Sequence, residues 1–146
     1  MNKQFYLAWL SYVVLTFALG FVWHLVLFPE LYLELEIYTR ILDPIIPMGL
    51  SAIALQGLIL AYLYPFYADL EHPIKSGLKF GWVIGVFMAS VAVIAEAAKN
   101  YVNSIPTWLI VETTYYLLQF SLVGLAFGWI HGKRCAEAPS PVSFSP

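Results

Sequence analysis

The stretch GLKFGWVIGVFMASVAVIAEAAK, residues 77–99, is long and apolar enough to cross a bilayer as one helix. At about 100° per residue, one narrow face of that helix carries four small residues and a carboxylate: Gly81, Gly85, Ala89, Ala92 and Glu96. Small side chains let a second backbone approach closely in lipid, so another helix should pack on this face. A carboxylate facing hydrocarbon is costly, so we expect Glu96 to point into a protein interior or a wet cavity.

The composition of the whole chain also indicates a membrane protein. Of its 146 residues, 61% are hydrophobic and 11% are charged, and the mean hydropathy is +0.77, whereas about a quarter of a soluble domain is charged. The formal net charge of −2 gives no reason to expect a nucleic-acid partner, and the lipid bilayer is the expected surrounding. The single cysteine, Cys135, excludes a disulfide framework within one chain.

Four apolar segments can be separated along the chain, each at or above the roughly 20 residues that a membrane span requires: residues 5–28, 45–67, 77–98 and 107–130. We therefore predict an all-α fold, an integral membrane antiparallel four-helix bundle formed by residues 1–134. Residues 135–146 are rich in proline and serine and are expected to form a disordered cytoplasmic tail.

The distribution of basic residues predicts the orientation in the membrane. The side that holds both termini carries Lys3, Lys75, Lys79, Lys133 and Arg134, and the opposite side carries Arg40 and Lys99. This excess favours a cytoplasmic location for both termini. The first loop then faces outward.

Apolar residues in the first loop recur at helical spacing, namely Leu31, Tyr32, Leu35, Tyr38, Leu42 and Ile45. This periodicity predicts a short outer interfacial helix between Pro29 and Ile46.

Glycines repeat every fourth residue in the third and fourth spans, at Gly77, Gly81 and Gly85 and at Gly124, Gly128 and Gly132. Only a short loop joins these spans, so they should be antiparallel neighbours. The two matched stripes indicate a close contact on the cytoplasmic side. The alternative is that glycine is simply frequent in membrane helices.

Three ionisable residues share one level of the predicted bundle, near its outer end: His24, Glu96 and Glu112. An imidazole and two carboxylates can bind a divalent metal ion, relay protons or hold a polar ligand, so they are candidate ligand-binding and metal-ligating residues. Each also has a simpler interpretation. Lys99 can pair with Glu96, Glu112 can reach interfacial water, and His24 can satisfy a neighbouring polar group.

A polar track extends from this level toward the midplane. Tyr116 and Gln119 share a helix face with Glu112, and Gln56 lies on a face of the second span with small residues. These residues are further candidates for ligand contacts in an outward-facing cavity. Gln56 and Gln119 are also expected to act as hydrogen-bonding groups between helices.

The histidines do not favour a haem cofactor, because His24 and His131 lie at opposite faces of the membrane and His72 lies in a loop. No cofactor is expected. Carboxylates and a histidine can act as acid and base, yet no nucleophile or cofactor motif accompanies them. An enzyme is therefore the weaker interpretation.

The runs Phe21-Val-Trp-His-Leu-Val-Leu-Phe-Pro-Glu-Leu-Tyr, Pro47-Met-Gly-Leu, Gln56-Gly-Leu, Ala95-Glu-Ala-Ala-Lys and Pro106-Thr-Trp, with Glu112, are similar to small uncharacterised bacterial four-span membrane proteins, classed as domains of unknown function. The resemblance implies the bacterial inner membrane and supplies no activity.

Two classes of function remain open. The first is binding, or help in transport, of a small polar ligand, proton or metal ion at the outward-facing polar site. The second is an accessory or structural subunit of a larger membrane complex. A homo-oligomer is a further expected arrangement.

Overall fold

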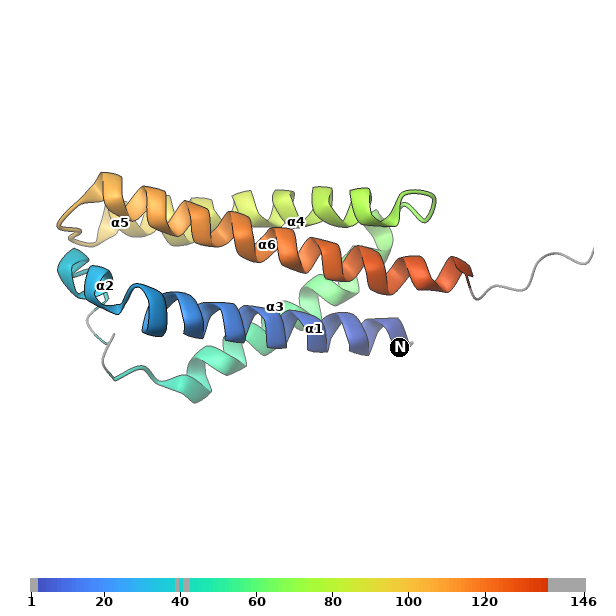
Figure 1. Ribbon diagram of the computed structural model, residues 1–146, viewed down its shortest axis with the longest axis horizontal. Coiled ribbons are helices and arrows are strands. Elements are labelled where there is room, and N and C mark those ends of the chain that lie inside the picture. Colours follow the sequence, from blue (N-terminus) through green and yellow to red (C-terminus); the bar gives the residue numbers. More distant parts are fainter. Residues whose placement is uncertain (1–2, 39, 41–42, 137–146) are drawn as a thin grey trace, which may run out of the picture.

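The computed structural model describes residues 3–38, 40 and 43–136 of the chain, with side chains through Gly132 (Figure 1). These residues form helices only: α1 (Lys3–Phe21), η1 (Val22–Leu27), α2 (Pro29–Leu35), α3 (Ile46–Tyr67), α4 (Pro73–Ala89), η2 (Ser90–Ala95), α5 (Glu96–Lys99) and α6 (Ile105–Ala136). η1 and η2 are π-helical turns that continue α1 and α4.

Four stretches are long and apolar enough to cross a membrane: Lys3–Leu27, Ile46–Tyr67, Pro73–Lys99 and Ile105–Gly132. The predicted all-α bundle of four apolar helices is confirmed. The last helix continues to Ala136, into the segment expected to be a tail, and residues 137–146 lie outside the described residues. In Figure 1, α2 lies at one end of the bundle, called here the α2 end. The N-terminus and the C-terminal end of α6 lie at the other, the terminal end.

Glycine brings the backbones of α4 and α6 together. A Cβ atom added at Gly81 would lie 2.2 Å from the Phe120 carbonyl oxygen, and one at Gly77 would lie 2.2 Å from that of Gly124. No real side chain tolerates such distances, so only glycine permits this approach. The close contact expected between the third and fourth spans is present, and it is the most extensive contact between any two helices of the described residues.

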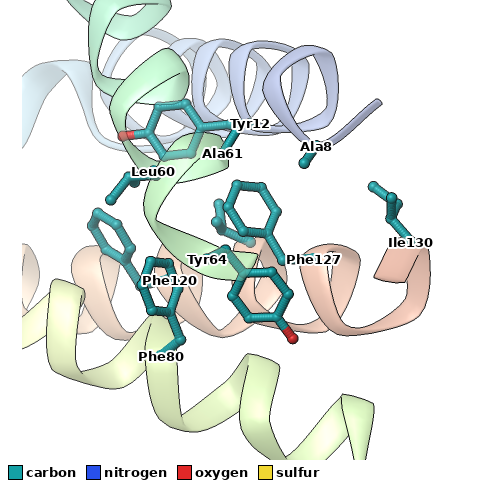
Figure 2. Packing of buried hydrophobic residues seen from close by; sticks show 10 residues of the cluster. Ala8, Tyr12, Leu60, Ala61, Tyr64, Phe80, Phe120, Phe127 and Ile130 are labelled. Carbon is teal, nitrogen blue, oxygen red and sulfur yellow. The ribbon is translucent and has the colours of Figure 1, made fainter. Parts of the chain in front are cut away.

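The third helix, α3, packs less evenly. Its C-terminal half contributes Leu60, Ala61 and Tyr64 to the main hydrophobic core, where the Tyr64 ring meets those of Phe80 and Phe127 at centroid distances of 5.2 and 5.4 Å (Figure 2). Its N-terminal half diverges from the other helices in Figure 1, and every residue from 43 to 52 is exposed. The bundle is therefore tight at the terminal end and open toward the α2 end on the α3 side.

The interfacial helix is shorter than predicted. α2 ends at Leu35 because Glu36 adopts a left-handed backbone conformation with a φ of 59°, which cannot continue a right-handed helix. Asn103 satisfies two free carbonyl groups at this helix end. Its backbone amide donates to the Leu35 carbonyl, and its side chain donates to the Glu34 carbonyl. Tyr32 and Leu35 are fully buried, so α2 packs on the bundle end. Leu42 lies outside the described residues.

The contact between α4 and α6 predicts a stability change for Gly81→Ala. The new methyl group would meet the Phe120 carbonyl oxygen, so the two helices would have to separate. We expect a loss of about 1–3 kcal/mol of unfolding free energy, as for other overpacked contacts. Thermal unfolding in detergent measures this loss. Gly49→Ala is the matched control, because nothing lies within 4 Å of its added Cβ. Equal melting temperatures for both variants would contradict the prediction.

Candidate functional site

A buried hydrogen-bond network joins three helical segments at the α2 end. Glu112 of α6 is 1% exposed, and its Oε1 atom accepts a hydrogen bond from the hydroxyl of Tyr32 in α2. His24 Nε2, from η1, lies 3.3 Å from the same oxygen. The indole Nε1 of Trp23 donates to the Tyr32 hydroxyl oxygen over 3.1 Å. One carboxyl oxygen therefore connects α6, η1 and α2.

The π-helical turns lie at the level of this network. η1 carries both Trp23 and His24, and the η2 residue Val93 accepts a hydrogen bond on its carbonyl from Trp108 Nε1 over 3.0 Å. In a π turn the backbone bonds shift from the fourth to the fifth residue, which rotates the following side chains relative to a regular helix. Such turns occur frequently at functional sites in proteins.

Hydrogen-bond directions determine how many protons the His24–Glu112 pair holds. His24 Nδ1 lies 2.9 Å from the Gly20 carbonyl oxygen, which can only accept, so Nδ1 carries a proton. Nε2 and the carboxyl oxygen both offer lone pairs, so an attractive contact between them requires one further proton. That proton belongs to an imidazolium beside a carboxylate or to a carboxylic acid beside a neutral imidazole. The pair has no net charge in either form, which suits burial within a membrane span.

Tyrosine rings surround the imidazole of His24. Its ring centroid lies 4.8 Å from that of Tyr32, 6.2 Å from that of Tyr38 and 4.8 Å from that of Tyr115. Burial, reinforced by the nearby Glu112 carboxyl group, raises the pKa of Tyr32 and of Tyr38 above the usual tyrosine value. Both hydroxyls therefore keep their protons at neutral pH, and Tyr32 acts as a hydrogen-bond donor.

A cavity of about 830 Å³ lies beside this network, between α1, η1, α3, α6 and the segment that precedes α3. Its volume falls within the range of about 300–1,000 Å³ that is usual for small-molecule sites. His24 lines the cavity and Glu112 does not, and their side chains are 20% and 2% exposed. A molecule in the cavity would therefore meet the imidazole before the carboxyl group.

Most of the cavity wall is apolar, and a few polar side chains interrupt it: Thr16, His24, Tyr38, Arg40, Gln56, Tyr115, Tyr116 and Gln119. Three of them, Thr16, Gln56 and Gln119, take part in hydrogen bonds between helices. Tyr12 donates to Gln56 Oε1 over 3.0 Å, and Gln119 Nε2 donates to Thr16 Oγ1 over 3.2 Å. These amide groups are thus both structural and part of the cavity wall, as the two interpretations of the sequence allowed.

The structure brings together most of the residues proposed from sequence. His24, Gln56, Tyr116 and Gln119 line one cavity, and Glu112 contacts His24. Glu96 differs, because the interactions of its carboxylate are with its own helix end. Its Oε2 lies 3.4 Å from Lys99 Nζ and its Oε1 accepts from Asn100 Nδ2 over 2.6 Å, as in the ion pair considered as its alternative. Within the described residues, no three His, Cys, Asp or Glu side chains gather in a metal-binding arrangement.

Sequence reasoning missed the first-loop residues of the site. Tyr32 and Tyr38 are part of the apolar periodicity of that loop, which predicts only that they lie on the face of a surface helix. Arg40 was considered only as an orientation signal, yet it lines the cavity. The aromatic character of Tyr32 and Tyr38, directly after the His24 segment, was the available signal. Trp23 and Trp108 also belong to this end of the bundle, where each donates a hydrogen bond to a group of the protein itself.

No protein-family model, curated protein or solved structure matches this chain. The fold and the four apolar helices are those of a small polytopic membrane protein.

The network predicts unequal effects for two substitutions of Glu112. Glu112→Leu removes the acceptor of the Tyr32 hydroxyl and the partner of His24, leaving buried polar groups unpaired. We expect a loss of about 3 kcal/mol in unfolding free energy. Glu112→Gln retains a carbonyl oxygen that accepts from Tyr32 and leaves only His24 without its partner, so its loss should be smaller. Thermal unfolding in detergent tests the order, and equal losses would contradict it.

Proposed function

We propose that this protein binds a small ligand in the cavity beside His24, or assists its transport. The observation that carries this proposal is the convergence of His24, Gln56, Tyr116 and Gln119 on one largely apolar cavity of about 830 Å³. Small-molecule sites in proteins combine apolar walls with a few well-placed polar groups in this manner. The buried Glu112 and Tyr32 behind His24 hold the imidazole in place.

The geometry favours a hydrogen-bonding organic ligand over a bare metal ion. Both ring nitrogens of His24 are already engaged, Nδ1 with the Gly20 carbonyl and Nε2 with Glu112 through the shared proton. A metal ion would have to displace that proton. Arg40 adds a positive charge to the cavity wall, whereas Phe17 and Ile53 are apolar parts of that wall. The expected ligand therefore has a polar group and an apolar body.

The proposed orientation places this cavity toward the outside of a bacterial inner membrane. Lys75 and Lys79 are exposed near the start of α4, and α4 begins at the terminal end of the bundle (Figure 1). Basic residues accumulate on the cytoplasmic side of membrane proteins, which supports a cytoplasmic location for both termini. A ligand would then enter the cavity from the outer side or from the outer leaflet.

Filling the cavity should abolish ligand retention. Gly49 lines the cavity, and nothing lies within 4 Å of a Cβ atom added there, so Gly49→Trp places an indole in open space. We expect solvent extraction and mass spectrometry of the purified wild-type protein to show a retained small molecule that Gly49→Trp lacks. Leu55→Trp is the matched control, because Leu55 is 60% exposed and does not line the cavity. A wild-type extract identical to that of Gly49→Trp would refute the proposal.

A second candidate function, an accessory subunit of a membrane complex, is favoured by one observation. Every residue from 43 to 52 is exposed, and this stretch includes the apolar side chains of Ile46, Met48 and Leu50. An apolar helix half without neighbours in its own chain can pack against another membrane helix.

Site-specific photocross-linking distinguishes this second function. A cross-linking residue at Met48, which is 66% exposed, should capture one defined protein in native membranes if α3 docks a partner. The same residue at Val86, 67% exposed on α4, is the control for lipid-facing positions of equal exposure. Equal and diffuse cross-linking at both positions would eliminate the docking role of α3.

A further inference from the structure

A second hollow, of about 500 Å³, lies along the outer surface of α4 at the terminal end. Residues 72–82 alone line it, so it is separate from the cavity beside His24. Its floor is apolar: Ile74 and Trp82 are 41% and 52% exposed, and Leu78 lies between them. We call this hollow the α4 groove.

The α4 groove lies on the exposed surface of α4, beside α6. Lys75, Lys79 and Trp82 recur at positions four and three residues apart, which places them on one face of the helix. Gly77 and Gly81, which contact α6, lie on the opposite side. The Trp82 indole reaches α6, where its Nε1 atom donates a hydrogen bond to Ser121 Oγ over 3.0 Å. The groove is thus part of the surface that α4 presents to lipid.

Two positive charges border this apolar floor. In the part of the chain that the structure describes, neither Lys75 nor Lys79 has a carboxylate within ion-pair distance. Of the acidic groups in the preceding loop, Asp69 is already engaged: it accepts from the backbone amides of Glu71 and His72 and lies 3.4 Å from the His72 imidazole. These hydrogen bonds lower the pKa of Asp69, so it stays a carboxylate beside His72.

We propose that the α4 groove binds an anionic phospholipid, with its phosphate between Lys75 and Lys79 and an acyl chain along Ile74, Leu78 and Trp82. Lysine stems lie along apolar surface while their ammonium groups reach the headgroup region, which is the geometry that this pairing needs. Basic residues at a membrane edge attract anionic lipids. A soluble anion would use the charges and leave the apolar floor uncovered, whereas a phospholipid occupies both.

Quenching of tryptophan fluorescence by brominated lipids tests this site, because Trp82 lies in the groove. The full chain is reconstituted in phosphatidylcholine vesicles that contain an equal mole fraction of acyl-brominated phosphatidylglycerol or acyl-brominated phosphatidylcholine. We expect the anionic lipid to quench more strongly, since it is enriched several-fold at the lysines. Trp82→Phe should remove the excess quenching, which assigns the signal to the α4 groove.

Two charge variants complete the experiment. Lys75→Gln with Lys79→Gln should lose the excess quenching by the anionic lipid. Lys3→Gln with Lys99→Gln removes the same charge elsewhere on the surface and should retain it. Equal quenching of the wild-type protein by both lipids overturns the proposal, and so does excess quenching that survives in Lys75→Gln with Lys79→Gln. The comparison of the wild-type protein with Trp82→Phe needs neither charge variant, and excess quenching that survives in Trp82→Phe also overturns the proposal.

Discussion

A carboxyl group buried among apolar helices must be satisfied by its neighbours, and Glu112 imposes this requirement on the whole α2 end. In a medium of low dielectric constant, an unpaired carboxylate or hydroxyl costs far more than in water. Glu112 meets the requirement with His24 from the first span and Tyr32 from α2. The consecutive segments η1 and α2 are thereby joined to the distant α6 at one oxygen atom. The position of α2 on the bundle follows from this network and from the hydrogen bonds of Asn103 to its C-terminal end.

The cavity follows from unequal packing of the four spans. The backbones of α4 and α6 meet at Gly77, Gly81 and Gly124. A larger side chain at any of these positions would force the two helices apart. α3 contacts α1 at Gly57, where an added Cβ would lie 2.8 Å from the Tyr12 ring. Beyond that point α3 diverges, and no described side chain fills the space it leaves. A close contact at one end and a divergence at the other create a wedge beside His24.

The sequence predicts the spans and their pairing because both depend on local composition. Apolar length gives the spans, and the spacing of small residues gives the contact between the last two. Depth and helical phase also bring His24 close to Glu112, although Glu96 shares their level and instead pairs with Lys99. Phase along a regular helix cannot foresee a π turn, which rotates the side chains after it. Periodicity also does not reveal that Glu36 adopts a left-handed backbone conformation. For this reason it predicts a longer first-loop helix than α2.

The π turns of η1 and η2 lie near the α2 end of the first and third spans. η1 forms the last 6 residues of the span Lys3–Leu27, and the 4 residues of α5 follow η2 in the span Pro73–Lys99. A π turn accommodates one extra residue relative to a regular helix, which offsets the faces on its two sides by about 100°. The side chains of η1, His24 among them, are therefore rotated relative to the positions that a regular continuation of α1 would give them. α1 contributes Ala8 and Tyr12 to the main hydrophobic core, whereas η1 carries His24 to its pair with Glu112. The change in helical register lets one continuous span serve the hydrophobic core over most of its length and the polar network at its end.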